Sequence, residues 1–460
     1  MSATATIRTF TSGASSAGEP PAAKPARVPQ QAASDTPASD TPASRPSVPG
    51  TAASGTAPAP VPRTHLAPWL SVSAALFAVA WGGNEFTPLL VMYRQLDQMS
   101  ALTVDILLGA YVLGIVPALL VGGPLSDRYG RRPLFLPAPL IAVAGSALLA
   151  AGAASAPVLF AGRVLSGIAL GLVMAVGTSW VKELSDAPFD PAPVEGRGAS
   201  RAALALTIGF ALGAGVAAAL AQFGPSGAIA PYVVHIVITL ASFVVLLRAP
   251  ESRTRPTEVR PLLMDLRIPT AMHRRFLLVV APMAPWVFGT AASAYAILPG
   301  LMMAQAPGFE IGVSGLLCVI ALGCGVAVQR FAAKIDTPRS ARGIGVALAV
   351  TVPAMLLAAV AVGLNSLAWA FVAAAVLGTA YGMLLVGGLR EIQRIAGPDD
   401  LAGLTAVYYS LTYVGFFIPA ILAALGTWLS YSTMFLAGAV IAALSVGVVA
   451  LSWRRHLPSA

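Results

Sequence analysis

The sequence predicts an all-α protein that crosses a membrane twelve times, with its helices in two halves of six. Three observations predict this fold class. Of the 460 residues, 57% are hydrophobic and 10% charged, twelve apolar runs reach spanning length, and positive charge falls in every second break. A soluble domain carries about 25% charged residues, because water must solvate its surface. The composition therefore argues against a soluble enzyme and a nucleic-acid-binding module.

Residues 1–66 differ in kind from the rest of the chain. They are rich in Ala, Pro, Ser, Thr and Gly and contain a short SDTPA repeat. Such a segment buries too little apolar surface to offset the entropy of ordering, so we expect a disordered cytoplasmic tail. The stretch lacks the basic-then-apolar layout of a secretory signal, so we expect it to be retained.

The remaining chain alternates between apolar runs and short polar breaks, and a membrane-spanning helix needs about 20 apolar residues. The runs are 68–92, 102–122, 133–153, 156–180, 200–222, 229–248, 275–302, 310–331, 341–362, 366–388, 402–427 and 430–452. The longest break separates the sixth run from the seventh. We expect a first bundle over 67–249, a cytoplasmic linker over 250–274, a second bundle over 275–453 and a cytoplasmic C-terminus over 454–460. Twelve helices in two halves are typical of secondary transporters built from repeats.

The positions of the basic residues predict the topology. Of the 28 Lys and Arg residues, 26 lie in the N-terminal tail, in the breaks after even-numbered runs, or at the C-terminus. The other two are Arg94, in the first break, and Arg163, inside the fourth run. By the positive-inside rule, both termini and the even breaks are cytoplasmic. The net charge of +9 therefore lies along a membrane face and does not indicate a nucleic-acid partner.

The two cysteines, Cys318 and Cys324, lie six residues apart in one apolar run. Helical geometry places them too far apart for a disulfide. Two thiols without a neighbouring His or Cys also make no metal site. We expect no metal and no cofactor.

The break after the second run reads GPLSDRYGRR over residues 123–132. Gly123 suits close helix packing, Gly130 suits a tight turn, and Asp127 suits pairing with an arginine or a helix N-terminus. The segment matches every defining position of G-x-L-x-D-R-x-G-R-R and so resembles the signature of the major facilitator superfamily. With the twelve-run layout, the resemblance covers about residues 68–455 and implies the fold of that family. It also implies a cytoplasmic latch in the outward-open state, a gating motif formed by Gly123, Asp127, Arg128, Gly130, Arg131 and Arg132.

Further segments resemble the same family. Arg163 and the glycines that follow it match a motif of the fourth helix, and APESR at 249–253 resembles the usual end of the sixth. The break after the eighth run carries a degraded copy of the loop motif, with Gln329 in place of the aspartate. The fifth run keeps Gly209 and Gly213 of the antiporter motif G-x-x-x-G-P but lacks its proline. That departure leaves the direction of transport open.

An ionisable residue inside a span is a functional candidate, because hydrocarbon solvates no charge. Glu85 and Arg163 each lie about seven residues from the outer end of a run, roughly 10 Å below the outer surface at about 1.5 Å per residue. In the fold that the resemblance implies, their helices adjoin, so the two charges can face each other. A carboxyl group that is ionised when paired and protonated when the partner leaves suits proton coupling. The alternative is a structural ion pair.

His235 and Asp105 are weaker candidates. In the family's fold the sixth helix faces lipid, and His235 lies near the outer interface, where polar side chains reach the headgroups. Asp105 opens the second run at the outer surface, where we expect it to be solvated.

The substrate should bind near the midplane between the halves. Aromatic side chains with polar tips suit an amphipathic organic molecule, although each could serve packing instead. The candidates are Asn84, Trp286, Tyr295, Tyr381, Tyr409 and Tyr413. Charged residues of the second half lie only at the ends of the runs and none lies in a run's interior, which favours a neutral, zwitterionic or singly charged substrate over a sugar phosphate.

These features predict a secondary active transporter that exports a small organic molecule in exchange for protons by alternating access. The preference for export rests on Glu85 and Arg163, which resemble the acid–arginine arrangement of drug/proton antiporters. The alternative is a proton symporter that takes up a small metabolite. A membrane enzyme or a substrate-sensing receptor fits less well, since the sequence offers neither a catalytic constellation nor an output domain.

We expect the partners to be the substrate, protons and the lipid bilayer, and the protein to be a monomer. Arg outnumbers Lys by 25 to three, and Ala and Gly abound. This composition suggests a high-GC bacterial genome, and hence the cytoplasmic (inner) membrane.

Overall fold

The computed structural model describes residues 67–96, 99–152, 155–194, 196–253, 268–337, 339–397 and 401–454. The expected tail over 1–66, most of the expected linker and the last six residues lie outside this described part. All statements below concern the described residues.

Every regular element of the described part is a helix. The α-helices of the first half are α1 (Pro68–Glu85), α2 (Leu90–Leu96), α3 (Ala101–Tyr129), α4 (Arg131–Phe135), α5 (Pro137–Ala151), α6 (Ala156–Leu172), α7 (Thr178–Leu184), α8 (Arg197–Phe223) and α9 (Ala230–Leu246). Those of the second half are α11 (Ala284–Ala292), α12 (Leu298–Met302), α13 (Glu310–Ile335), α14 (Arg342–Gly363), α15 (Leu367–Ile395), α16 (Leu401–Tyr413), α17 (Ile418–Leu425) and α18 (Tyr431–Leu451). In hydrocarbon a backbone must satisfy its own hydrogen bonds, so long apolar runs fold as helices.

Eleven helical segments of the described part are long and apolar enough to cross a membrane. Each of the twelve predicted runs coincides with helix. The remaining run is α9, which is apolar but only 17 residues long. The prediction of an all-α, many-times-spanning protein is therefore confirmed, while the number of crossings and the side on which the termini lie stay predictions.

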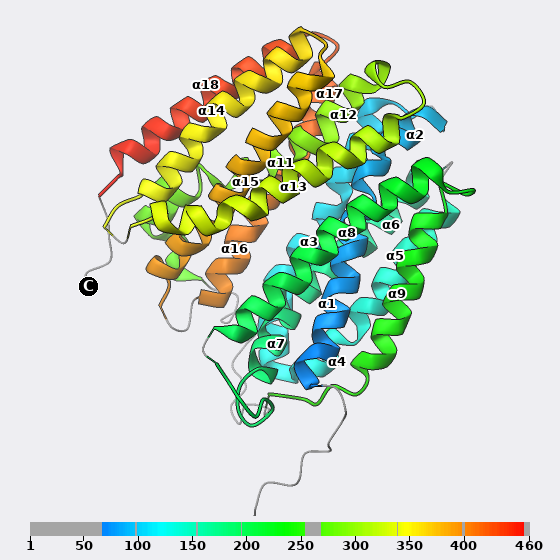
Figure 1. The fold of residues 1–460 in the computed structure, drawn as a ribbon. Coiled ribbons are helices and arrows are strands. Elements are labelled where there is room, and N and C mark those ends of the chain that lie inside the picture. Colours follow the sequence, from blue (N-terminus) through cyan, green and yellow to red (C-terminus); the bar gives the residue numbers. More distant parts are fainter. Residues whose placement is uncertain are drawn as a thin grey trace, which may run out of the picture. The chain divides into compact units, whose positions relative to one another are not determined.

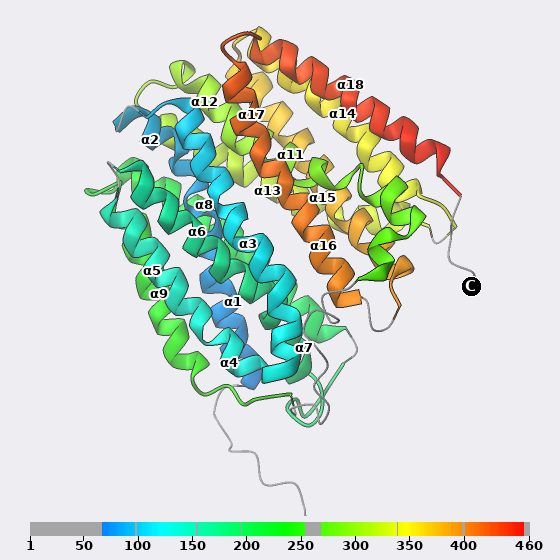
Figure 2. The same cartoon turned by 180° about the vertical axis from the view of Figure 1, so that it is seen from behind.

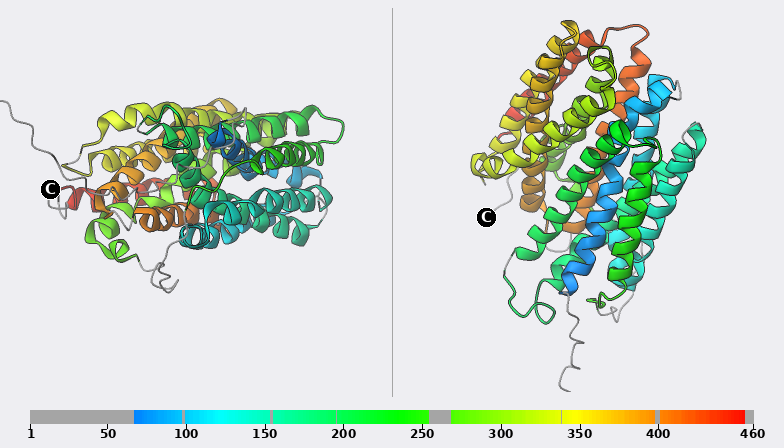
Figure 3. Two further views of the ribbon diagram at one scale, coloured as in Figure 1. Left: turned by 90° about the horizontal axis from the view of Figure 1, so that it is seen from below. Right: turned by 45° about the vertical axis from the view of Figure 1, so that its right-hand side comes forward.

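The two halves lie beside each other in opposite views (Figures 1 and 2). The first half runs from blue to green and the second from yellow-green to red. Within the first half α3 packs on α6 and α1 on α8, and within the second half α13 and α14 both pack on α15. The halves touch through α8 against α13 and through α3 against α16 and α17. Figure 3 shows the same grouping from below and from the side.

Short irregular turns interrupt several of the spanning helices. Three are π-helical, Val173–Gly177 before α7, Phe276–Val280 before α11 and Ser293–Ile297 before α12, and two are 3₁₀ turns, Thr87–Leu89 and Val414–Phe417. Such interruptions redirect the residues that follow and are frequent at functional sites. Four of these five turns contribute residues to the wall of the cavity described below, and Phe276–Val280 does not.

The halves also meet through hydrogen bonds at the end of the molecule remote from the Arg131 loop. The amide of Gln222, near the end of α8, donates to the carbonyl of Gly308 at 3.0 Å. Its oxygen accepts from the N–H of Gly312 at the start of α13, at 2.8 Å. This contact joins the halves at one end and leaves room between them at the other.

Candidate transport site

A cavity of about 2100 Å³ lies between the two halves. Its wall reaches from Asn84 and Arg163, inside the bundle, to Asp127 and Arg131 at one end of the helices. Arg94 and Asp105, at the opposite end of α2 and the start of α3, do not line it. The cavity therefore extends towards the loop that the arginine count predicts to be cytoplasmic.

Glu85 is completely buried beside this cavity, at the end of α1. The hydroxyl of Ser146 on α5 lies 2.9 Å from Glu85 Oε1, and His235 Nδ1 on α9 lies 3.4 Å from the same oxygen. The other carboxyl oxygen, Oε2, is buried without a hydrogen-bond partner in the described part. A carboxyl group in such a place is held by three helices and does not face the cavity directly.

His235 corrects an expectation from the sequence. It is 1% exposed and faces the protein interior, not the outer interface. Its Nε2 lies 3.0 Å from the carbonyl oxygen of Ala78 and its Nδ1 lies 2.7 Å from Ser146 Oγ. The helix α9 does expose an apolar face, including Val237, but its polar residues lie on the opposite face, against α1 and α5. A helix at the edge of the bundle exposes one face and buries the other, and His235 lies on the buried face.

Arg163 on α6 is 1% exposed and lines the cavity. Its guanidinium lies over the rings of Phe86 and Tyr111, 4.6 and 4.4 Å from their centroids. Its Nε donates weakly to the carbonyl of Leu107 at 3.4 Å, and Nη1 is buried without a hydrogen-bond partner among the described residues. Cation–π contact stabilises a desolvated arginine by about 2 kcal/mol, far less than the hydration it loses.

Glu85 and Arg163 thus share one buried region and act on each other electrostatically. The two side chains make no direct ion pair. The carboxyl group of Glu85 is hydrogen-bonded to Ser146, whereas the guanidinium of Arg163 stacks on the rings of Phe86 and Tyr111. The two helices α1 and α6 do adjoin, as the resemblance implied. The exchange of a proton at this pair stays a prediction.

Aromatic side chains dominate the deep part of the cavity. Of the six predicted substrate residues, five line it: Asn84, Tyr295, Tyr381, Tyr409 and Tyr413. Trp286 does not line it, and its indole N–H donates to the hydroxyl of Ser445 on α18 at 3.2 Å. On α11, the face that carries Trp286 turns towards α18 and away from the first half.

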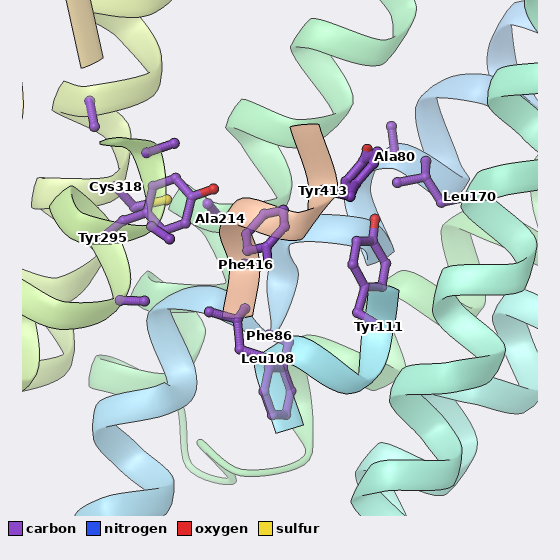
Figure 4. Packing of buried hydrophobic residues seen from close by; sticks show 14 of the residues in the cluster. Ala80, Phe86, Leu108, Tyr111, Leu170, Ala214, Tyr295, Cys318, Tyr413 and Phe416 are labelled. Atoms are coloured by element: carbon purple, nitrogen blue, oxygen red, sulfur yellow. The ribbon is translucent and has the colours of Figure 1, made fainter. Parts of the chain in front are cut away.

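Five aromatic residues that were not predicted from the sequence also line the cavity, namely Tyr111, Phe210, Phe288, Phe331 and Phe416. Phe288 stacks on Tyr413 and on Phe416, with ring centroids 4.5 and 4.9 Å apart. Tyr111, from the first half, meets Tyr413 edge-on at 6.2 Å; Figure 4 shows this meeting of the halves. In the sequence these residues look like ordinary members of apolar runs, so no signal distinguished them.

Two hydrogen bonds to sulfur atoms also join the halves beside the cavity. The amide of Asn84 donates to the carbonyl of Phe210 on α8 at 3.1 Å and contacts Cys318 Sγ of the second half at 3.9 Å. The hydroxyl of Tyr413 donates to Met174 Sδ of the first half at 3.4 Å. These weak contacts are easily exchanged for contacts to a ligand.

The predicted gating motif forms a dense ionic cluster at the end of the cavity. The side chain of Arg131 is 6% exposed and lies 2.8 Å from Glu183 on α7 and 2.9 Å from Asp127. Asp127 is 44% exposed and also lies 3.4 Å from Arg253. Arg131, Glu183 and Asp127 belong to the first half and Arg253 to the segment directly after it, so these contacts lie outside the second half.

The segment after α9, which resembles the family's usual ending, holds the motif loop. The carboxylate of Glu251 accepts from the backbone N–H groups of Arg131 and Arg132, at 3.0 and 2.9 Å, as expected of an anion at a helix N-terminus. Gly130 has φ of 104°, which an L side chain rarely adopts. Gly123 differs from expectation: a Cβ there would meet no described atom within 4 Å, because it faces the cavity.

The second half has its own ionic cluster at the same end. Arg394 on α15 pairs with Glu391 at 2.8 Å and with Asp336 after α13, and the buried Arg275 pairs with Glu391. The degraded copy of the loop motif has Gln329 at the position of the aspartate. The acids of this cluster are Asp336, further along the same break, and Glu391 on α15.

Asp105 also corrects an expectation. It is 2% exposed, and its carboxylate accepts from Arg94 at 2.9 Å. Arg94 is the one arginine predicted to lie on the outer side, and the sequence analysis did not pair the two. The acid is shielded because α2 folds back over the start of α3.

Comparison with known proteins agrees with this architecture. A family model described as Major Facilitator Superfamily matches residues 70–418. The chain belongs to this superfamily, as the loop motif suggested. It is therefore a multi-pass membrane protein and a secondary transporter, not an enzyme.

Among curated proteins, the solute carrier family 2, facilitated glucose transporter member 10 of Mus musculus is 40% identical over 86 residues. The matched stretch covers 19% of this chain and 16% of the relative. The chain thus matches only a small part of that relative's length.

Solved transporters share the fold at low sequence identity. A peptide transporter POT in complex with sulfate has a TM-score of 0.68 and 13% identity, over 85% of this chain and 96% of that one. The POT family transporter PepTSo has a TM-score of 0.65 and 15% identity, over 84% and 96%. The nucleoside transporter NupG has a TM-score of 0.64 and 10% identity, over 84% and 99%. At such identities the likeness concerns the fold alone.

Proposed function

We propose that the protein is a proton-coupled transporter that exports a small organic molecule by alternating access. The observation that carries the proposal is the placement of two buried ionisable residues: Arg163 lines a cavity between two helical halves, and Glu85 lies behind it. An ionisable pair inside a membrane is costly and is retained where it does work. A carboxyl group there can take up a proton when its surroundings become less polar and release it when an arginine approaches.

The cavity wall favours a small organic substrate of low charge. Its deep part offers the tyrosines, Asn84 and Thr87 as hydrogen-bonding groups on an aromatic surface. Among the described residues, Arg163 is the only charged one that lines the cavity away from its charged end. Such a wall suits a neutral molecule or one with a single negative group.

A second candidate is proton-coupled uptake, and the placement of Arg163 favours it. The guanidinium faces the cavity, whereas Glu85 lies behind it. A substrate acceptor that binds Arg163 would leave Glu85 without its counter-charge and favour its protonated form, so substrate and proton would travel together. The local similarity to a facilitated glucose transporter is compatible with uptake of a neutral, hydroxyl-rich molecule.

The test begins with the purified full chain and a thermal-shift screen of small organic molecules, because a ligand raises the melting temperature by mass action. A compound that binds is then loaded into, or offered to, liposomes that contain the protein. An imposed pH gradient should drive its accumulation against its own gradient. Movement opposite to the protons identifies export, movement with them identifies uptake, and transport that ignores the pH gradient contradicts the proposal.

We further propose that the protein works in the cytoplasmic membrane of a bacterium, as a monomer, with both termini in the cytoplasm. The proposal is supported by the arginine distribution and by the cavity, which reaches the arginine-rich end. Light scattering of the detergent-solubilised protein measures the oligomeric state.

A further inference from the structure

Three buried side chains form a continuous hydrogen-bonded chain in the first half. Glu85 Oε1 lies 2.9 Å from Ser146 Oγ, and Ser146 Oγ lies 2.7 Å from His235 Nδ1. The far nitrogen of the ring, Nε2, lies 3.0 Å from the carbonyl oxygen of Ala78. The residues come from α1, α5 and α9, and each is at most 1% exposed.

The direction of each hydrogen bond follows from what each atom can donate. A carbonyl oxygen only accepts, so His235 Nε2 carries a hydrogen in every state of the chain. If the ring is neutral, Nδ1 is an acceptor and Ser146 donates to it. Ser146 has one hydrogen, so the remaining contact requires Glu85 to be protonated and to donate to Ser146 Oγ.

All hydrogen bonds of the chain are also satisfied when Glu85, and not the imidazole, has lost the proton. If Glu85 is ionised, Ser146 donates to its carboxylate. The contact between Ser146 and Nδ1 then requires a hydrogen on Nδ1, so that His235 carries two hydrogens and a positive charge. Both states satisfy every contact and contain the same number of protons.

We propose that Glu85, Ser146 and His235 form a proton relay in which His235 is a second resting place for the coupling proton. The proton of Glu85 moves to Ser146 Oγ while the hydroxyl proton of Ser146 moves to His235 Nδ1. A neutral acid and a neutral imidazole become a carboxylate and an imidazolium, with no atom gained or lost. This inference rests on the proposed function for its role in transport, but the relay itself is defined without a substrate.

The position of the relay proton determines whether the carboxyl group of Glu85 near Arg163 is neutral or negatively charged. With the proton on Glu85 the arginine has no carboxylate beside it, and with the proton on His235 the ionised Glu85 can attract it. Glu85 Oε2 and Arg163 Nη1, which have no hydrogen-bond partner in the described part, are the groups left for that contact. The other ionisable groups around Arg163 and Glu85 are Tyr93 of α2, Tyr111 of α3 and Tyr232 of α9, and these phenols are neutral at physiological pH.

The packing of α1 makes room for the imidazole. A Cβ at Gly82 would lie 2.3 Å from Cε1 and 2.4 Å from Nε2 of His235. A glycine at this position therefore lets the ring lie flat against the helix and reach Ala78. The histidine is positioned by backbone on one side and by Ser146 on the other.

The test follows both ends of the relay in the full chain, reconstituted in lipid, without any substrate. The ¹⁵N NMR signals of labelled histidine report the protons on each ring nitrogen, and the infrared carbonyl band of a protonated carboxylic acid reports Glu85. His235→Gln and Glu85→Gln assign the two signals. Both states hold the same number of protons, so the pH is kept constant and a change of temperature shifts the balance between them. In the wild type the loss of the acid band should coincide, in extent and in temperature, with the gain of doubly protonated His235, and the neutral ring should carry its hydrogen on Nε2.

Ser146→Ala breaks the relay without removing either ionisable group, so the loss of the acid band and the gain of doubly protonated His235 should no longer coincide. Ser166→Ala is the matched control, because this buried serine donates to Gly162 of its own helix and its loss should preserve the coincidence. A neutral ring with its hydrogen on Nδ1 overturns the relay. So does a coincidence that survives Ser146→Ala, or its absence from the wild type.

A transport measurement separates this inference from the proposed function. With the compound found by the thermal-shift screen, Ser146→Ala should lower proton-driven accumulation about ten-fold or more and leave exchange of the compound close to wild type. If the wild type itself shows no proton-driven accumulation, the proposed function fails, while the spectroscopic result still decides whether the relay exists. Wild-type accumulation in Ser146→Ala overturns the role of the relay in coupling.

Discussion

The guanidinium of Arg131 lies 2.8 Å from the carboxylate of Glu183, so the loop after α3 is bonded to the end of α7. Both residues belong to the first half, and Ser252 after α9 donates to the same glutamate at 2.5 Å. The motif therefore bonds the loop after α3 to α7 and to the segment after α9. In this conformation, with the cavity reaching the motif, Asp127 pairs with Arg131 and with Arg253, and neither partner lies in the second half.

Glu183→Gln should destabilise the protein more than Asp127→Asn. Arg131 is nearly buried and Glu183 is 29% exposed, so loss of this charge leaves a desolvated guanidinium short of a partner, at a cost of about 1–2 kcal/mol. Asp127 is 44% exposed, and exposed pairs contribute below about 1 kcal/mol. Melting temperatures of the purified variants check the order. An equal or larger fall in melting temperature in Asp127→Asn would show that the exposed aspartate contributes at least as much to stability as Glu183 does.

Gly82→Ala should destabilise the protein, whereas Gly123→Ala should leave its stability almost unchanged. The new methyl group at residue 82 would overlap the His235 ring, and overpacking in a core costs about 1–3 kcal/mol. The methyl group at residue 123 would meet no described atom within 4 Å, so this variant should melt within a few degrees of the wild type. A comparison of the two melting curves is sufficient. Tolerance of alanine at residue 82 would contradict the close fit of the imidazole.

The Asp190–Arg201 contact in the break between α7 and α8 should make stability depend on pH. The guanidinium of Arg201, 2.8 Å away, and the N–H of Ala192 lower the pKa of Asp190 below its ordinary value. A group with a lowered pKa in the folded state stabilises fully above its unfolded pKa of about 4 and loses this stabilisation as the pH falls through the lowered value.

Asp190→Asn should therefore lower the melting temperature at pH 7. The difference in melting temperature between this variant and the wild type should shrink as the solution is made acidic. Arg201→Gln should reproduce this pattern, since it removes the other partner. Parallel melting curves for variant and wild type over the whole acid range would rule out this contribution.

Single cysteines should show which side each loop faces. In a chain with Cys318 and Cys324 replaced, Ala192→Cys lies in the exposed break after α7 and Thr427→Cys in the exposed turn after α17. The positive-inside rule predicts that an impermeant maleimide added to intact cells labels residue 427 only. Labelling of residue 192 from outside would reverse the predicted topology.

The comparison of sequence and structure shows what apolar patterns reveal and what they hide. Twelve runs of spanning length predicted the helices, because in hydrocarbon the backbone has few alternatives to a helix. The rarity of charges inside spans singled out Glu85 and Arg163, and the family resemblance implied that their helices adjoin. Ser146 was invisible, because a serine in an apolar run carries no signal until His235 is known to lie 2.7 Å away.

The main errors in the predictions from sequence concern which face of its helix a residue lies on. His235 was assigned to lipid from the usual place of its helix, and Trp286 to the cavity from its aromatic chemistry, yet each lies on the other face of its helix. A short run with few polar residues does not define a face by periodicity alone. The pairing of Arg94 with Asp105 was missed because it depends on how α2 packs against α3, which no pattern of apolar residues describes.

The most direct test of the account is the effect of Glu85→Gln on transport in liposomes. The amide keeps the size of the side chain and a hydrogen bond to Ser146 but cannot titrate, so proton-driven accumulation should be lost while exchange of the compound across the membrane persists. Glu310→Gln, at the start of α13 and away from the cavity lining, is the control that should retain accumulation. Moving one charge across 100 mV supplies about 2.3 kcal/mol, and only a group that changes protonation within the cycle can use it. Unchanged accumulation in Glu85→Gln would contradict the account, and a fall in melting temperature with an unchanged pH profile would make Glu85 a structural residue.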